Sequence, residues 1–95
     1  MLIEWDPEKA RRNLKKHGVS FDKAATVFFD PLSATFDDSD HSVAEERYIT
    51  IGYSSQSNLL VVAYVEREKT IRIISARHAT TRERKRHDQA PCRAG

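Results

Sequence analysis

The sequence predicts an α+β fold, in which a mainly antiparallel sheet of three to five strands carries two N-terminal helices and one C-terminal helix on one side. Three observations lead to this prediction. Two capped, amphipathic segments precede residue 31, three strand-like segments joined by short turns occupy residues 47–76, and a short, highly charged helical segment follows them. The expected order is short strand, helix, helix, three or four strands, helix.

After a short apolar start at residues 2–5, a helix is predicted over residues 7–17. Asp6 is a suitable N-cap, Pro7 favours the first helical position and Gly18 favours the stop. Apolar residues are few here, so the helix should present only a narrow face to the core. The residues expected on that face are Ala10, Leu14 and His17.

A second helix is predicted between Ser20, its N-cap, and Pro31, which ends it. Its apolar residues recur at helical spacing, as expected for a buried face: Phe21, Ala24, Ala25 and Phe28. Residues 32–36 are expected to form a short strand before an acidic loop at residues 37–42.

Three strands in a meander are predicted next. Residues 47–53 alternate between apolar and polar, residues 59–65 are continuously apolar, and residues 70–76 are rich in isoleucine. A strand that is apolar on both faces belongs in the middle of a sheet, so residues 59–65 should be central. The last helix, residues 80–88, begins with Thr80 and Glu83 at the spacing of a capping box.

Length and composition indicate one domain. A chain of 95 residues can bury one core, so residues 1–89 should form a single domain and residues 90–95 a disordered tail.

The longest apolar run is too short to cross a bilayer and no signal peptide is recognisable, so we expect a cytoplasmic protein with no membrane contact. Cys92 is the single cysteine, which excludes an intramolecular disulfide and a cysteine metal site.

Positive charge gathers in the second half of the chain. Residues 1–50 hold 7 basic and 10 acidic side chains (−3), whereas residues 51–95 hold 9 and 4 (+5), which gives the net charge of +2. Several arginines on one sheet face would suit a phosphate backbone, since the guanidinium fork binds phosphate through two hydrogen bonds. For Arg84, Lys85 and Arg86 the residues alone favour the solvated side of a helix.

Arg72 interrupts the isoleucine-rich strand and should share a face with Ile74. Its partner is expected to be either a phosphate or, about equally, Glu46 or Glu66 in an ion pair. Arg77 has the opposite parity along the strand. Unless the strand ends or bulges near Ala76, the two arginines cannot serve one site.

Proton-transfer and metal chemistry have weaker signals. His78 and His87 are candidate proton-transfer groups, because the imidazole group is a common general acid or base, but lone histidines on short elements are usually surface residues. Glu83 suits a base, although its capping position favours a structural role. The acidic loop offers the candidate metal ligands Asp37, Asp38, Asp40 and His41. It lacks the glycine and the distal glutamate of a calcium loop, so no metal or cofactor is predicted.

Four segments together resemble the BrnT family of ribonucleases from type II toxin–antitoxin systems: "EWDPEKARRNLKKHGVSFDKAATVF", "EERYITIG", "LLVVAYVER" and "IRIISARHATTRERKR". The resemblance runs from Ile3 to Asp88. It implies a compact fold similar to RelE toxins and a metal-independent endoribonuclease that blocks translation, using 2′-hydroxyl attack on the phosphate. It also implies neutralisation by a BrnA antitoxin whose ribbon-helix-helix domain binds operator DNA, with the toxin dimeric in that complex.

The resemblance also suggests roles for individual residues. The implied catalytic candidates are Arg67, Arg72, Arg77, Glu46, Arg47, Glu83 and His87, the last standing where family members frequently carry tyrosine. The implied RNA-binding candidates are His78, Arg82, Lys85 and Arg86. The alternative is a non-catalytic module that binds RNA or a partner protein through the same basic face. A DNA-binding autoregulator acting alone is less favoured, because no helix-turn-helix spacing occurs.

Overall fold

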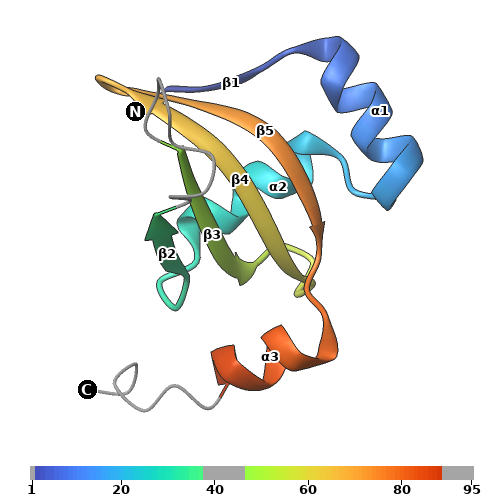
Figure 1. Ribbon diagram of the computed structural model, residues 1–95, viewed down its shortest axis with the longest axis vertical. Helices are drawn as coiled ribbons and strands as arrows, with labels where there is room; N and C mark the ends of the chain where they lie inside the picture. Colours follow the sequence, from blue (N-terminus) through green and yellow to red (C-terminus); the bar gives the residue numbers. More distant parts are fainter. Residues whose placement is uncertain (1, 38–46, 89–95) are drawn as a thin grey trace.

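The computed structural model describes residues 2–37 and 47–88, which form a five-stranded sheet with helices on both faces (Figure 1). The elements in chain order are β1 (Leu2–Trp5), α1 (Pro7–His17), α2 (Phe21–Ala25), the 3₁₀ helix η1 (Thr26–Phe29), β2 (Ala34–Asp37), β3 (Arg47–Tyr53), β4 (Leu59–Arg67), β5 (Thr70–His78) and α3 (Thr81–Asp88). Within these ranges no helix is long and apolar enough to cross a membrane.

The strand order is β1-β5-β4-β3-β2, with β4 in the middle as its continuous apolar run predicted. The pairs β2–β3, β3–β4 and β4–β5 are antiparallel, whereas β1 pairs with β5 in parallel, so the sheet is mixed. The predicted α+β class and short initial strand are confirmed. The parallel pair joins segments about seventy residues apart, and local sequence patterns carry no signal for such pairing.

The main core lies between one face of the sheet and the helices α1 and α2. Phe21 and Val27 pack there against alternate residues of β4, Leu60 and Val62. The packing is so close at β3 that a Cβ on Gly52 would lie 2.9 Å from Val27 Cγ1, which explains the glycine in that strand.

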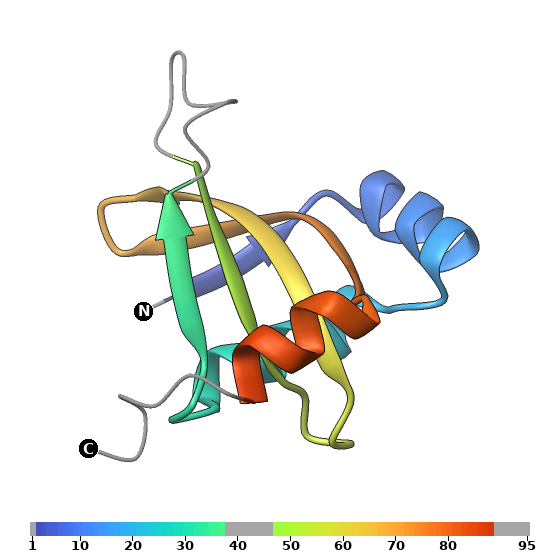
Figure 2. The same cartoon turned by 60° about the horizontal axis from the view of Figure 1, so that its bottom comes forward.

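Helix α3 lies on the opposite face of the sheet, so the prediction that all helices pack on one side was wrong (Figure 2). Apart from His87, its residues are mostly exposed, and it carries no apolar stripe that would reveal its position from sequence. Polar contacts hold it instead. The Tyr53 hydroxyl donates to Asp88 (3.0 Å), and the His87 ring packs edge-on against Tyr53.

The inward face of α1 also differs from the prediction. Leu14 is 50% exposed, whereas Asn13 is buried and Ala10 is partly buried against the core. The Asn13 side chain donates to the carbonyl oxygens of Ala76 (2.8 Å) and Val19 (2.9 Å), and accepts from the Ala76 N–H (3.1 Å). Because β1 pairs only with residues 70–73 of β5, this side-chain amide satisfies the backbone further along the same edge.

Candidate functional site

The candidate site lies on the sheet face opposite α1 and α2, which we call the open face. Side chains alternate along each strand, so the strand residues that alternate with those facing α1 and α2 point to this face. Its central residues are Ile49, Ile51, Val61, Val65, Arg72, Ile74 and Arg77. It carries two hollows, one at each end of β5.

A bulge in β5 brings Arg72 and Arg77 to the same face. Ala63 pairs with Ser75 and the next residue, Tyr64, pairs with Ile73, so Ile74 is an additional residue in the ladder. The bulge at Ile74, two residues before Ala76, reverses the side-chain alternation of the residues that follow it. Arg72 and Arg77, which a regular strand would place on opposite faces, therefore lie on the same face. The two arginine positions are about 15 Å apart along the strand.

The hollow beneath α3, which we call the α3 groove, has a volume of about 530 Å³. One side is apolar and comes from β2, β3 and β4, and the other is polar and comes from β5 and α3. Its lining residues are Ala34, Phe36, Ile49, Ile51, Val61, Arg77, Glu83, Arg86 and His87. Three of the catalytic candidates, Arg77, Glu83 and His87, are therefore brought together here.

Arg77 and Glu83 form a bidentate ion pair, with Nη1–Oε1 and Nη2–Oε2 distances of 2.8 and 2.9 Å. Glu83 also completes the predicted capping box, accepting from the Thr80 N–H (2.8 Å) while its own N–H donates to Thr80 Oγ1 (3.1 Å). The hydrogen bonds from Arg77 lower the pKa of Glu83 to about 2 and raise that of Arg77. In this state the Glu83 carboxylate is a weak base.

His87 has both ring nitrogens close to oxygen atoms. Nε2 lies 3.1 Å from the carbonyl oxygen of Leu32, which can only accept, so this nitrogen carries a proton. Nδ1 lies 3.4 Å from Asp88 Oδ1, and the side chain is only 4% exposed. The contact with Leu32 ties α3 to the segment before β2. The two contacts favour an anchoring role, while a catalytic role for His87 stays a prediction.

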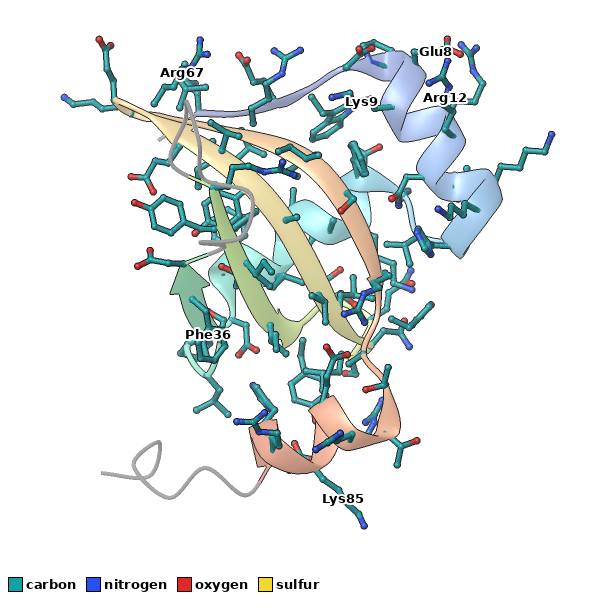
Figure 3. All side chains as sticks on the ribbon, viewed as in Figure 1. Glu8, Lys9, Arg12, Phe36, Arg67 and Lys85 are labelled. Atoms are coloured by element: carbon teal, nitrogen blue, oxygen red, sulfur yellow. The ribbon has the colours of Figure 1, made fainter. Side chains whose placement is uncertain are left out.

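The second hollow, at the β1 end of β5, has a volume of about 770 Å³. Arg72 donates there to Glu4 across the parallel pair (2.9 Å), so its partner is neither of the two glutamates that the sequence suggested. Both side chains are about half exposed. Arg67 and Lys9 add positive charge to the lining, and both lie at this end of the sheet in Figure 3.

The remaining candidates lie apart from the two hollows or outside the described residues. Glu46, Asp38, Asp40 and His41 lie outside them, so the expectations for those residues remain predictions. Arg47 pairs with Val65 beside Arg72, so its alternation places it on the open face. The pairing of His78 with Leu60 puts it on the opposite face.

On α3 the basic residues divide between the groove and solvent. Arg86 lines the α3 groove, whereas Arg82 and Lys85 are exposed and do not line it. Lys85 points away from the sheet in Figure 3. Phe36 and Tyr53 lie near this site but were not predicted from the sequence. The sequence feature that could have indicated them is an aromatic residue at an outward position of a predicted strand.

The fold and the site together define a small mixed α+β domain that presents arginine and glutamate side chains on an exposed face of its sheet. A family model described as the ribonuclease toxin BrnT of type II toxin–antitoxin systems matches residues 5–83. The chain belongs to this BrnT family, as the resemblance of its sequence motifs predicted.

A solved structure supports the fold independently. The crystal structure of the Brucella abortus ribonuclease toxin BrnT superimposes with a TM-score of 0.66 at 24% sequence identity. The match covers 85% of the present chain and 99% of the Brucella chain. No curated protein sequence matched the chain at a significant level.

Proposed function

We propose that this protein is a toxin that cleaves RNA inside the cytoplasm without a metal ion and so stops translation. The observation that carries the proposal is the presentation of Arg72 and Arg77 on one open face, on either side of a bulge. Family membership supports the ribonuclease activity. The chemistry needs charge stabilisation and proton transfer, which protein side chains can supply.

In the proposed reaction the ribose 2′-oxygen bonds to phosphorus while the bond to the 5′-oxygen breaks. This leaves a 2′,3′-cyclic phosphate and a 5′-hydroxyl, and the proton lost by the 2′-hydroxyl balances the proton gained by the 5′-oxygen. Arg77 is assigned to the phosphoryl oxygens, where negative charge develops. A donor preorganised at such a position contributes about 3–4 kcal/mol to lowering the barrier.

The ion pair with Glu83 gives Arg77 a second part in this scheme. The two N–H groups that now reach Glu83 are the fork that would bind a phosphate. A phosphate that accepts them removes the largest cause of the lowered pKa of Glu83. Glu83, still held by the Thr80 N–H, then becomes a stronger proton acceptor next to the substrate.

The other basic residues are assigned to RNA binding. Arg67, Arg72 and Lys9 would hold the RNA backbone at the β1 end, and Arg86 would hold it beside Arg77. Arg82 and Lys85 would contribute only long-range attraction, because they are exposed on α3. His78, on the opposite face, is the weakest of the RNA-binding candidates.

A second candidate function is RNA or protein binding without cleavage. It is favoured by one observation, that Glu83 and His87 are both engaged in contacts that suit a structural role. A purified protein that binds RNA but leaves it intact would support this second function.

The partner is proposed from the family. Membership in a type II system implies an antitoxin, and we propose a BrnA-type protein whose ribbon-helix-helix domain contacts operator DNA on behalf of a complex with two toxin copies. Co-expression, affinity purification and light scattering would give the composition of the complex. A one-to-one complex would contradict the dimer.

The first test of the activity is digestion of purified RNA in the presence of EDTA by wild type and Arg77→Ala, both checked by circular dichroism. Cleavage by wild type alone, with 2′,3′-cyclic phosphate ends, is expected. Failure of wild type to cut free RNA and RNA on ribosomes would contradict the proposal.

The acidic loop provides a separate test of metal independence. The double substitution of Asp38 and Asp40 by Asn removes two of its carboxylates, and we expect it to leave cleavage within about twofold, because these side chains have no part in the proposed chemistry. The measurement is the initial rate with EDTA and with added Mg²⁺. Loss of cleavage that added Mg²⁺ restores would revive a metal site in this loop.

A further inference from the structure

Phe36 is an exposed aromatic side chain at the edge of the sheet. It lies in β2, is 54% exposed, and pairs with Ile49 of β3. Single exposed aromatic residues are common on protein surfaces and need no explanation in themselves. Phe36 differs because it lines the α3 groove, whose opposite side holds Arg77 and Arg86.

The α3 groove has an apolar side that suits a nucleotide base and a cationic side that suits its phosphate. The strand pairings extend in a row from Ala34 through Ile51 and Val61 to Arg77, so the groove changes from apolar to cationic across the sheet. Phe36 lies on the apolar side, at the β2 position seen in Figure 3. A phosphate suits the cationic side, and a flat, weakly polar base suits the other.

We propose that Phe36 stacks on a base of single-stranded RNA whose adjacent phosphate is held by Arg77 and Arg86. This inference deepens the proposed ribonuclease function, on which its catalytic meaning rests, by assigning the base-binding side of the same groove. Every base has a π-face, so stacking of this kind tolerates different bases. Few lining residues of the groove offer hydrogen bonds on its apolar side, and the expected sequence preference is therefore weak.

RNA fits the groove better than a peptide does because of the distribution of charge. An acidic peptide would satisfy the arginines, but the exposed aromatic ring of Phe36 at the sheet edge adds nothing specific for a carboxylate. For a nucleotide both sides of the groove contribute. Duplex RNA is disfavoured, since its bases are stacked on each other and not available to Phe36.

The experiment uses the full chain and a 2′-O-methyl oligoribonucleotide that carries a single 2-aminopurine. The methyl group removes the nucleophile, so binding is measured without cleavage. Wild type is expected to quench the 2-aminopurine fluorescence, and Phe36→Tyr should retain the quenching. Phe36→Ala should lose it and bind about tenfold more weakly. The matched control is Phe29→Ala, which removes an exposed phenylalanine outside the groove and should behave as wild type.

The outcomes separate this inference from the function on which it rests. Phe36-dependent quenching by a protein that cuts no RNA would support the stacking site while contradicting the ribonuclease proposal. Cleavage of RNA without any effect of Phe36→Ala on quenching or affinity would overturn the stacking site alone. Equal losses in Phe36→Ala and Phe29→Ala would also overturn it. Intact RNA binding with lost antitoxin binding in Phe36→Ala would assign the groove to the antitoxin instead.

Discussion

The two ends of strand β5 carry the same pair of residue types, an arginine and a glutamate, but hold them in different ways. At the α3 end, Arg77 and Glu83 are six residues apart in sequence and meet through two hydrogen bonds. At the β1 end, Arg72 and Glu4 are sixty-eight residues apart and meet through one. The Arg77–Glu83 pair is also less exposed, at 41% and 28%, against 51% and 52% for Arg72–Glu4.

The backbone of β5 is supported differently at the two ends as well. Residues 70–73 pair with a strand, β1, through a regular parallel ladder. Ala76, next to Arg77, pairs instead with the side chain of Asn13. The bulge at Ile74 lies between these two supports. The buried Asn13 side chain thus binds the β5 backbone at the Arg77 end, as strand β1 does at the Arg72 end. We infer that the Arg77 end positions its substrate precisely, whereas the Arg72 end is a binding surface that tolerates variation.

The largest expected effect distinguishes the two arginines in catalysis. Arg77→Ala should lower kcat by about 10²–10³-fold and relieve growth arrest, because it removes the proposed donor to the phosphoryl oxygens. Arg72→Ala should raise KM about tenfold with little change in kcat, because it removes a backbone contact remote from the reacting phosphate. Single-turnover and steady-state cleavage of a labelled oligoribonucleotide would separate the two parameters.

Arg84→Ala is the matched control for both variants, since Arg84 is exposed on α3 and does not line the groove. It should cleave as wild type does. Equal kinetic losses in Arg72→Ala and Arg77→Ala would break the proposed division between the two ends. An unfolded Arg77→Ala protein would show that the arginine is scaffold, because the capping box through Glu83 would then depend on it.

The next effect concerns the support of the Arg77 end. Asn13→Ala leaves the buried N–H and carbonyl oxygen of Ala76 and the carbonyl oxygen of Val19 without this partner, which should cost about 3 kcal/mol of unfolding free energy. Leu14→Ala, on the neighbouring exposed position, should cost under about 1 kcal/mol. Urea unfolding of the two variants measures both values. If Leu14→Ala lost more unfolding free energy than Asn13→Ala, the sequence-based prediction that Leu14 faces the core would be favoured instead.

The contrast between Asn13 and Leu14 shows what the sequence could predict. Local interactions were predictable: the Asp6 cap accepts from the Glu8 N–H, Gly18 adopts a left-handed conformation with φ of 71°, and the capping box closes as expected. The central position of β4 followed from burial on both faces. Each of these features depends on residues close together in the chain or on one strand alone.

The features that were missed depend on contacts between distant parts of the chain. Asn13 was not among the residues predicted to face the core, and its partner Ala76 is sixty-three residues away in sequence. The side chosen by α3 is set by polar contacts to Tyr53 and Leu32, which leave no periodic pattern in the helix. The bulge in β5 was one of two alternatives that the sequence left open, because the opposite parity of Arg72 and Arg77 fitted either an irregular strand or two separate sites.

The smallest expected effect is the pH dependence of the Arg77–Glu83 ion pair. The folded-state pKa of Glu83 is about 2, below its ordinary value of 4.5, so its ion pair stabilises the folded protein fully above pH 4.5. That stability is lost as the pH falls from about 4.5 to about 2, because protonation then becomes easier in the unfolded chain. Screening at this partly exposed site limits the contribution to about 1–2 kcal/mol.

Glu83→Gln removes this titrating group and keeps a side chain of similar size. Between about pH 5 and about pH 2.5 the wild type should therefore lose about 1–2 kcal/mol more stability than Glu83→Gln. Urea unfolding at the two pH values gives the comparison. If Glu83→Gln lost as much stability as the wild type between these pH values, the ion pair with Arg77 would contribute no measurable stability, and its bidentate geometry would no longer distinguish a precise end of the open face from a tolerant one.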